Sequence, residues 1–511
     1  MFGQRSETKR LKTLADLEQR QQRLRPAYKI WGYKNVFAKG FLITKGAIDY
    51  APHEKWETLE FGPWRAQLDP ELERQSASYG DFGILILGQV FDDRGPAKRH
   101  EIAARLLKTL RSVEPRPLAE PVEDLAEPVE VPRKAMDEAI TWLSGRYVVF
   151  VRRGETLDIY GDPMATRSCY WHDTGESVAL TSHTAILSEL VGGLPSKRMQ
   201  WILRHPDYKS PAGKWLPGLI TPHDEVGQIF ANGRLTVRGR EVTNQRFYPS
   251  EDRTELSLDE AAEMFREELQ QQVRNWIAVA PQTVLALTAG SDSRAVLEAG
   301  IVDLQEAEAV TLTYHPFHVA KKSTYDDLVQ ANRVAAAARL PQLVLDVAQM
   351  TPTSQMARLY TRTFPTWQRY ANLANAFYVG APAKAAMLFG IGGGIATGVY
   401  KDRSASAPTT ELLAKKYAQS KVASDSELQQ EMARWTVFAD FSVEHLRGYD
   451  FHDFFHWEHR LSKWAGAGYS EYDLATIPAP VFSSRRLLST ALSVTLEHRE
   501  SKSLYARLRQ P

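Results

Sequence analysis

The chain has 511 residues, of which 43% are hydrophobic, 24% charged and 10% aromatic, as in an ordinary globular protein. Its 63 Lys and Arg residues balance 62 Asp and Glu residues, and a net charge of +1 argues against a general nucleic-acid coat or a polyacidic partner. The only cysteine, Cys169, excludes an internal disulfide, a Cys-rich zinc site and an iron–sulfur cluster, and we expect a cytoplasmic protein.

The N-terminal segment 1–26 is rich in Lys and Arg, and Leu11, Leu14 and Leu17 recur at helical spacing. The pattern predicts a basic helical extension. One interpretation is an arm for nucleic acid or an anionic membrane, and the favoured one is a solvated helix packed by one face. We expect no secretory signal and no transmembrane helix, because no long apolar run occurs.

Residues 27–250 predict a strand-rich domain of antiparallel hairpins with one or two helices. The continuous apolar run 83–91 is typical of a buried strand, and 100–110 has helical spacing. Residues 111–134 hold five prolines and many Glu residues and predict an extended acidic excursion. The dipeptide Asn232-Gly233, between strand-like segments, gives the strongest short hairpin signal.

The pattern changes near residue 251. Ser257 and Glu260 have capping-box spacing and predict the start of an amphipathic helix. Strand-like segments then alternate with helical stretches, at 283–287, 310–313 and 343–345. This alternation predicts parallel βαβ units, and the chain is mostly helical from 405 onward.

The strongest chemical signal is the segment TAGSDSR at 288–294, where a buried strand ends and a helix begins. Such a junction directs backbone N–H groups and the positive helix end at one point, which suits an anion. Gly290 permits close backbone approach, and Asp292 offers a hard oxygen ligand for magnesium. Hydroxyl donors come from Thr288, Ser291 and Ser293. The alternative is a hydroxyl-rich turn that only caps a helix.

The loop resembles the pyrophosphate-binding SGGxDS loop of the N-type ATP pyrophosphatases, and Arg294 makes it most similar to the asparagine synthetase branch. Six upstream segments resemble, in order, parts of a class II glutamine amidotransferase domain: 83–91, 143–147, 162–167, 180–182, 216–218 and 246–249. The resemblance implies an Ntn-hydrolase-like antiparallel αββα sandwich over 27–250. It implies an adenine-nucleotide α-hydrolase-like parallel sheet with helices over 251–511.

In this family the C-terminal domain activates a carboxylate as its acyl-adenylate, releasing pyrophosphate, and an amine or ammonia then forms the amide. The resemblance therefore implies ATP and Mg2+ as cofactors. It implies a small-molecule or peptide carboxylate and an amine acceptor as partners, no membrane or nucleic acid, and leaves oligomerisation open. The residues that would hold pyrophosphate, metal or nucleotide are Leu287, Thr288, Gly290, Ser291, Asp292, Ser293, Leu312, Thr313 and Gly392, with Asp292 as the metal ligand.

The chain departs from the family at the glutaminase nucleophile. The family exposes a cysteine after removal of the initiator Met, whereas this chain has Phe2 there and Cys169 inside a predicted strand. Cys169 is interpreted as a core thiol. We expect no glutamine hydrolysis, a property shared with β-lactam synthetases and lasso-peptide cyclases, whose amine comes from the substrate.

A second departure lies in the Gly-rich segment 388–400. The family carries an Asp-Glu pair where this chain has Gly394 and Ile395, so a carboxylate that helps to bind magnesium is missing. Asp326 and Asp327 are candidates to compensate. A degenerate, non-catalytic binding or scaffold protein on the same fold is the alternative function.

The family also places a Lys near the phosphates late in the chain, and Lys502 and Arg499 are the candidates, against a solvated tail. Glu458 and Arg460 are candidates for an acyl-acceptor pocket. Three histidines share one predicted helical face, at 452, 456 and 459. They suit zinc, but the surrounding aromatic residues favour a structural face. A serine hydrolase has no support, because no G-x-S-x-G elbow occurs.

Overall fold

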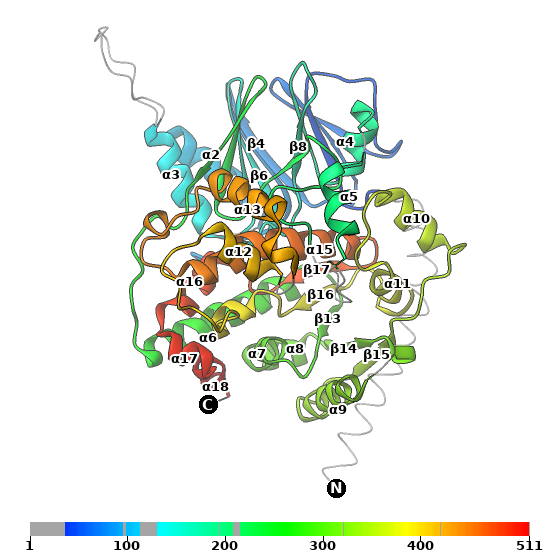
Figure 1. The fold of residues 1–511 in the computed structure, drawn as a ribbon, viewed down its shortest axis with the longest axis vertical. Coiled ribbons are helices and arrows are strands. Elements are labelled where there is room, and N and C mark those ends of the chain that lie inside the picture. The colour runs from blue at the N-terminus through cyan, green and yellow to red at the C-terminus, as the bar shows by residue number, and fades with distance from the viewer. Residues whose placement is uncertain are drawn as a thin grey trace.

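The computed structural model describes residues 36–95, 99–112, 130–193, 195–206, 208, 215–319, 321–418 and 421–509. The first half folds into two antiparallel sheets, and the second half folds into a parallel sheet with helices (Figure 1). The predicted extension 1–26 and Phe2 lie outside the described residues.

The first antiparallel sheet has the strand order β10-β8-β9-β1-β3-β2. Its strands are β1 (Phe41–Lys45), β2 (Glu57–Phe61), β3 (Trp64–Leu68), β8 (Tyr170–Asp173), β9 (Val178–Thr181) and β10 (Gly227–Gln228). The second sheet has the order β12-β11-β7-β6-β5-β4. Its strands are β4 (Arg74–Tyr79), β5 (Phe82–Asp92), β6 (Leu143–Arg153), β7 (Thr156–Gly161), β11 (Gly233–Arg238) and β12 (Glu241–Arg246).

The two sheets stack because alternate side chains of each strand point to opposite faces. Ile43 of β1 and Leu85 of β5 belong to the buried cluster between the sheets. Ile84 of β5 belongs to a second cluster, with α2 (Ile102–Ser112) and α3 (Glu130–Thr141). Helix α4 (Thr184–Val191) packs on the first sheet through a further apolar cluster. The predicted αββα sandwich is confirmed.

Two local predictions for this half are wrong. The segments on either side of Asn232-Gly233 do not form a hairpin, because β10 pairs with β8 in one sheet and β11 pairs with β7 and β12 in the other. Asn232 has the positive φ of 66° that a turn signal predicts, but its turn carries the chain between sheets. In the predicted extended excursion, 113–129 lies outside the described residues, and its end is helical because α3 begins at Glu130.

The second half contains a parallel sheet with the order β15-β14-β13-β16-β17. Its strands are β13 (Thr283–Ala286), β14 (Val310–His315), β15 (Gln342–Asp346), β16 (Ala386–Phe389) and β17 (Ile477–Pro480). Leu285 and Val284 lie in different apolar clusters, so the central strand is buried on both faces, as parallel sheets require. The predicted parallel α/β fold is confirmed.

Helices cover this sheet and connect it to the sandwich (Figure 1). Besides α2 to α4, the first half contains α5 (Lys197–Arg204). The α-helices of the second half are α6 (Leu258–Ile277), α7 (Ser291–Ala299), α8 (Ile301–Glu306), α9 (Lys322–Ala337), α10 (Gln355–Thr363), α11 (Ala371–Gly380), α12 (Thr410–Tyr417), α13 (Ser426–Phe438), α14 (Phe451–Phe454), α15 (Gly466–Tyr472), α16 (Arg485–Ser493), α17 (Leu496–Glu500) and α18 (Ser503–Arg507). Helix α6 begins with the predicted capping box of Ser257 and Glu260. Within the described residues, no helix is both long and apolar enough to cross a membrane.

The three histidines predicted to share a helical face lie in two different elements. His452 belongs to α14, and the other two belong to η6 (Phe455–Ala465), which is a π-helix. The wider turn of a π-helix breaks the i, i+4 alignment on which the prediction depended. His452 Nδ1 lies 2.8 Å from Asp450, and the Gly218 amide donates to His459 Nε2 at 2.9 Å.

Buried charges join the two halves. Arg146 of the sandwich makes two hydrogen bonds to the Asp473 carboxylate, at 2.8 and 2.7 Å, and Arg167 makes another at 3.1 Å. Lys39 Nζ donates to the carbonyl oxygens of Asp473 and Thr476, at 2.9 and 2.7 Å. Burial raises the pKa of Asp473, but the two guanidinium groups outweigh it and hold that pKa at about 2.

Candidate functional site

The phosphate-loop candidate lies where β13 ends and α7 begins. The helix starts at Ser291, within the predicted segment 288–294, so 291–293 belong to its first turn. Gly290 occupies the N-cap position, is exposed, and supplies no side-chain cap. The first N–H groups of an α-helix have no partner within the helix, and they carry the positive end of its dipole. The geometry suits an anion at this end of α7.

Two of the predicted hydroxyls shape the loop itself. The Thr288 amide donates to Ser293 Oγ at 3.1 Å, and the Gly290 amide donates to Thr288 Oγ1 at 3.1 Å. Ser293 is buried. These bonds hold the chain in the tight path that leads into α7, so Thr288 and Ser293 act on the shape of the loop.

Lys502 reaches the same loop from the far end of the sequence. Its Nζ donates to Ser291 Oγ at 3.2 Å. Lys502 precedes α18 and has a left-handed backbone, with φ of 59°. The structure therefore brings Lys502, Ser291 and the start of α7 together, as the resemblance implies. A cation beside open N–H groups strengthens the attraction of this point for an anion.

Asp292 faces the Gly-rich segment 388–400. Its Oδ1 lies 3.2 Å from the Tyr505 hydroxyl, which also lies 2.9 Å from the Gly393 carbonyl oxygen. Burial raises the pKa of Asp292, opposed by the Tyr505 and Ser291 hydroxyls and by the Lys502 charge. Tyr505 was missed by sequence reasoning, since a tyrosine near a terminus has no motif of its own.

The backbone of the Gly-rich segment touches the loop. A Cβ at Gly390 would lie 2.8 Å from the backbone of Asp292 and Ser293, and a Cβ at Gly393 would lie 2.8 Å from Asp292 Cβ. Gly392, predicted beside the nucleotide, instead packs on the sandwich: its Cβ would lie 2.7 Å from Met164 Sδ. Glycine at 390 and 393 is what permits this close approach.

A carboxylate already contacts one loop amide. The Ala289 amide donates to Asp327 of α9, and Asp327 also pairs with His315 Nε2 at 2.8 Å. Of the two compensating candidates, Asp326 and Asp327, Asp327 is the one that bonds to the loop in the described residues. A phosphate oxygen that used the same amide would compete with this carboxylate.

The predicted nucleotide-bordering residues of the strands are buried. Leu287 donates its amide to the Leu312 carbonyl at 2.9 Å, and Thr313 Oγ1 donates to the Leu287 carbonyl at 2.9 Å. All three side chains lie in the interior. They hold the carboxyl ends of β13 and β14 beside the loop and have no open surface.

Two predicted catalytic residues, Glu458 and Arg499, form buried ion pairs. Glu458 accepts two hydrogen bonds from Arg246, at 2.6 and 2.7 Å, and another from Asn232 at 3.0 Å. Arg499 donates to Asp453 at 2.7 Å. These contacts give both residues a structural role, Arg499 next to the Gly-rich segment through the Ile395 carbonyl.

The loop supplies one carboxylate for a magnesium ion. Only Asp292 offers a carboxylate within the loop, and Gly394 and Ile395 contribute none. Among the residues that the structure describes, no three His, Cys, Asp or Glu side chains gather as metal ligands. Mg2+ in proteins is usually held by one or two carboxylates together with substrate phosphates and waters, so the Asp292 carboxylate suits an ion that would arrive with ATP.

Cys169 lies in the apolar cluster between the two sheets. It is fully buried, and burial raises the pKa of its thiol far above the usual range. Because a thiolate is the reactive form, this thiol is inert in the folded chain.

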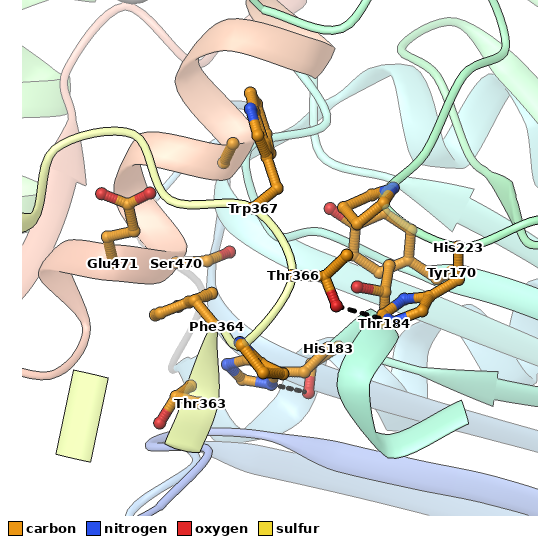
Figure 2. Close-up of a pocket in the computed structure, with 14 residues that line it drawn as sticks. Tyr170, His183, Thr184, His223, Thr363, Phe364, Thr366, Trp367, Ser470 and Glu471 are labelled. Carbon is orange, nitrogen blue, oxygen red and sulfur yellow. Dashed lines mark hydrogen bonds between the residues drawn. The ribbon is translucent and has the colours of Figure 1, made fainter. Parts of the chain in front are cut away.

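A small cavity lies elsewhere, between the sandwich and the second half (Figure 2). Its volume of about 40 Å³ is room for about three water molecules. His183 and His223 line it, and each has one ring nitrogen with no partner among the described residues, although His183 Nδ1 lies 2.7 Å from Ser182 Oγ. Thr366 contacts His223 Nε2 at 2.9 Å. The cavity is too small for a nucleotide.

Comparison with solved structures gives matches of low similarity. One is a structure of the allosteric regulatory enzyme of purine biosynthesis, with 12% identity, a TM-score of 0.22, and coverage of 62% of this chain and 78% of that one. Another is glutamine phosphoribosylpyrophosphate amidotransferase from B. subtilis complexed with ADP and GMP, with 11% identity, a TM-score of 0.21, and coverage of 65% and 66%. No family model matches the chain, and no curated protein matches it.

Proposed function

We propose that the chain is an ATP-dependent carbon–nitrogen ligase that joins a carboxylate to an amine through an acyl-adenylate, without hydrolysing glutamine. One observation carries the proposal: the Lys502 ammonium meets Ser291 Oγ, at 3.2 Å, at the uncapped start of α7. Residues 211 positions apart thus form one anion site at the carboxyl end of a parallel sheet. Such sheets bind ligands at that end.

In the proposed reaction, a carboxylate oxygen of the substrate attacks the α-phosphorus of ATP, and the bond to the bridging oxygen breaks. Pyrophosphate leaves with the negative charge. The amine nitrogen then attacks the acyl carbon, the bond to AMP breaks, and the nitrogen gives up a proton. Lys502 and the α7 N–H groups neutralise the leaving pyrophosphate, which is the step where charge develops.

The absence of a reactive thiol in the sandwich agrees with an amine that comes from the substrate or from free ammonia. Cys169 is buried in the apolar core. The described sandwich begins its first strand at Phe41, and Lys39 just before it is tied to Asp473 and Thr476. We infer that the sandwich supports the second half and takes no part in chemistry.

A non-catalytic binding protein is the second candidate, and particular contacts favour it. Tyr505 and Gly393 cover Asp292, and Asp327 occupies the Ala289 amide. A site held in this way binds an anion weakly and lacks the second carboxylate of the family pattern. This candidate predicts nucleotide binding, or none, and no turnover.

The test is exchange of labelled pyrophosphate into ATP with a panel of carboxylates. The proposal predicts exchange with at least one carboxylate, and a loss of about 100-fold in Lys502→Ala and in Asp292→Ala. Lys401→Ala is the matched control, since Lys401 is 68% exposed and pairs with Glu500. Nucleotide binding without exchange across the panel would support the non-catalytic candidate.

A further inference from the structure

Arg460 is a cation without an anionic partner in the described residues. It lies in the π-helix η6, is only partly exposed, and forms no ion pair or hydrogen bond to a carboxylate in the described part of the chain. Its guanidinium lies 5.1 Å from the ring centre of Trp215 and 5.6 Å from that of Trp464. Burial lowers the pKa of Arg460. A partly desolvated guanidinium with five donors is costly unless an acceptor binds it.

A second cation lies beside it. The Arg369 guanidinium lies 5.2 Å from the centre of the same Trp464 ring. Its terminal nitrogens bond to neutral groups, the Trp464 carbonyl and the Tyr370 hydroxyl, while the buried Glu471 carboxylate accepts from the Arg369 backbone N–H at 2.9 Å and is stabilised by the Arg369 charge. Arg369 contributes to lowering the pKa of Arg460, so the two charges repel each other across this site. Two adjacent cations on aromatic faces raise the attraction for an anion.

Further polar groups lie at this place. His456 is only 6% exposed, and its Nδ1 has no hydrogen-bond partner among the described residues. The Tyr400 hydroxyl bonds to the Arg460 guanidinium and to no other group within that part of the chain. The rings of His456 and Tyr400 lie 6.1 Å apart, and the Arg460 charge acts on the pKa of both. Arg460, His456 and Tyr400 therefore form one cluster.

The cluster adjoins the phosphate loop through the Gly-rich segment. A Cβ at Gly394 would lie 3.8 Å from His456 Nε2, and a Cβ at Gly393 would lie 2.8 Å from Asp292. The Gly-rich segment therefore contacts both the start of α7 and the Arg460 cluster.

We propose that Arg460, assisted by Arg369, binds a carboxylate of the substrate other than the one that is activated. A guanidinium matches a planar carboxylate with two parallel hydrogen bonds, whereas the aromatic walls hold it in place. The proposal rests on the proposed ligase function and names its substrate class: molecules that keep a free carboxylate through the reaction. His456 and Tyr400 supply hydrogen bonds to the same end.

The test is ligand-observed NMR with the full chain and no nucleotide, using glutarate and its neutral analogue glutaramide. Wild type is expected to bind glutarate and not glutaramide. Arg460→Gln should weaken glutarate binding by roughly 30-fold or more, because a buried charge pair is lost. Arg460→Lys keeps the charge and loses the two-bond geometry, so it should recover part of the affinity.

Arg240→Gln is the control, because Arg240 is 60% exposed and pairs with Asp173. Unfolding midpoints of all variants show whether they fold. If Arg460→Gln does not fold, Arg460→Lys serves as the test variant in its place. Equal binding of both probes, no binding to wild type, or inorganic phosphate bound as well as glutarate would overturn the proposal. Because nucleotide is omitted, failure here is separate from failure of pyrophosphate exchange.

Discussion

The buried cluster at Asp473 and the loop at α7 differ in how their charged groups are paired. Around Asp473, Arg146, Arg167 and Lys39 converge on one carboxylate, with hydrogen bonds of 2.7 to 3.1 Å from the two arginines. At α7, by contrast, the first N–H groups have no side-chain cap, and the Lys502 ammonium donates to a neutral hydroxyl, while the Asp292 carboxylate acts on it only through its charge.

This difference separates structural charges from functional ones. A buried pair satisfied on every side stabilises an arrangement and has no capacity left for a ligand. A cation whose donors are not all taken by a carboxylate keeps capacity for an anion. Glu458 and Arg499 belong to the first kind, and Lys502 and Arg460 to the second.

Removing the Asp473 carboxylate should have the largest effect. Asp473→Ala leaves three cations unpaired in the interior and should lower the free energy of unfolding by about 3–5 kcal/mol, measured by urea denaturation. Asp252→Ala, at an exposed pair with Arg447, should cost about 0–1 kcal/mol. Equal effects for the two variants would contradict the assignment.

Because of the Asp473 carboxylate, the stability of the fold should also depend on pH in the acid range. The pKa of Asp473 is about 2 in the folded chain, below the ordinary unfolded value of about 3.9. A depressed carboxylate pKa stabilises the fold above the unfolded pKa and loses that contribution as pH falls through the folded one. Wild type should therefore lose stability from about pH 5 downward, and Asp473→Ala should lose less over that window.

Glu458→Gln should have the next largest effect. The amide keeps the shape of the side chain but removes the charge that faces Arg246 in the interior. We expect a loss of about 2–4 kcal/mol in the free energy of unfolding. A variant that unfolds like wild type but loses pyrophosphate exchange would return Glu458 to a catalytic role.

Cys169 gives a smaller, independent effect. Its thiol should react with a disulfide reagent only when the chain unfolds, since burial raises its pKa and covers the sulfur. Cys169→Ala should cost about 1–2 kcal/mol of stability and leave any pyrophosphate exchange unchanged. Fast labelling of the native chain would show that the thiol is accessible.

Asp327→Asn should have the smallest effect, at the loop. The side-chain oxygen of the asparagine can still accept the hydrogen bond from the Ala289 N–H, but the negative charge beside the incoming phosphates is removed. We expect ATP to bind about fivefold more tightly, by calorimetry at low salt. Weaker binding would mean that Asp327 assists the nucleotide rather than competing with it.

The sequence predicted the fold well where one local rule sufficed. Apolar runs located β5 and β13, and the capping box located the start of α6. The Asn232-Gly233 signal failed because strand pairing is decided by the whole sheet: Asn232 holds Glu458 and Arg485 with its side chain, and the chain crosses between sheets there. A turn motif carries no information about which sheet receives the next strand.

The site was predictable only in part. The strand–loop–helix signal placed 288–293 at a helix start, and the resemblance placed Lys502 near it. Tyr505, Asp327 and the contact of Gly390 with Asp292 are long-range features, which no spacing within a motif encodes. The structural role of Glu458 likewise depends on its ion pair with Arg246, a residue of the other half.

The most direct test of the central claim is calorimetric binding of a non-hydrolysable ATP analogue to the wild type, Lys502→Ala and Lys401→Ala. If the start of α7 with Lys502 is a nucleotide-phosphate site, wild type and Lys401→Ala bind alike. Lys502→Ala then binds about tenfold or more weakly at an unchanged unfolding midpoint. No binding to wild type, or equal affinity in all three proteins, would contradict the claim.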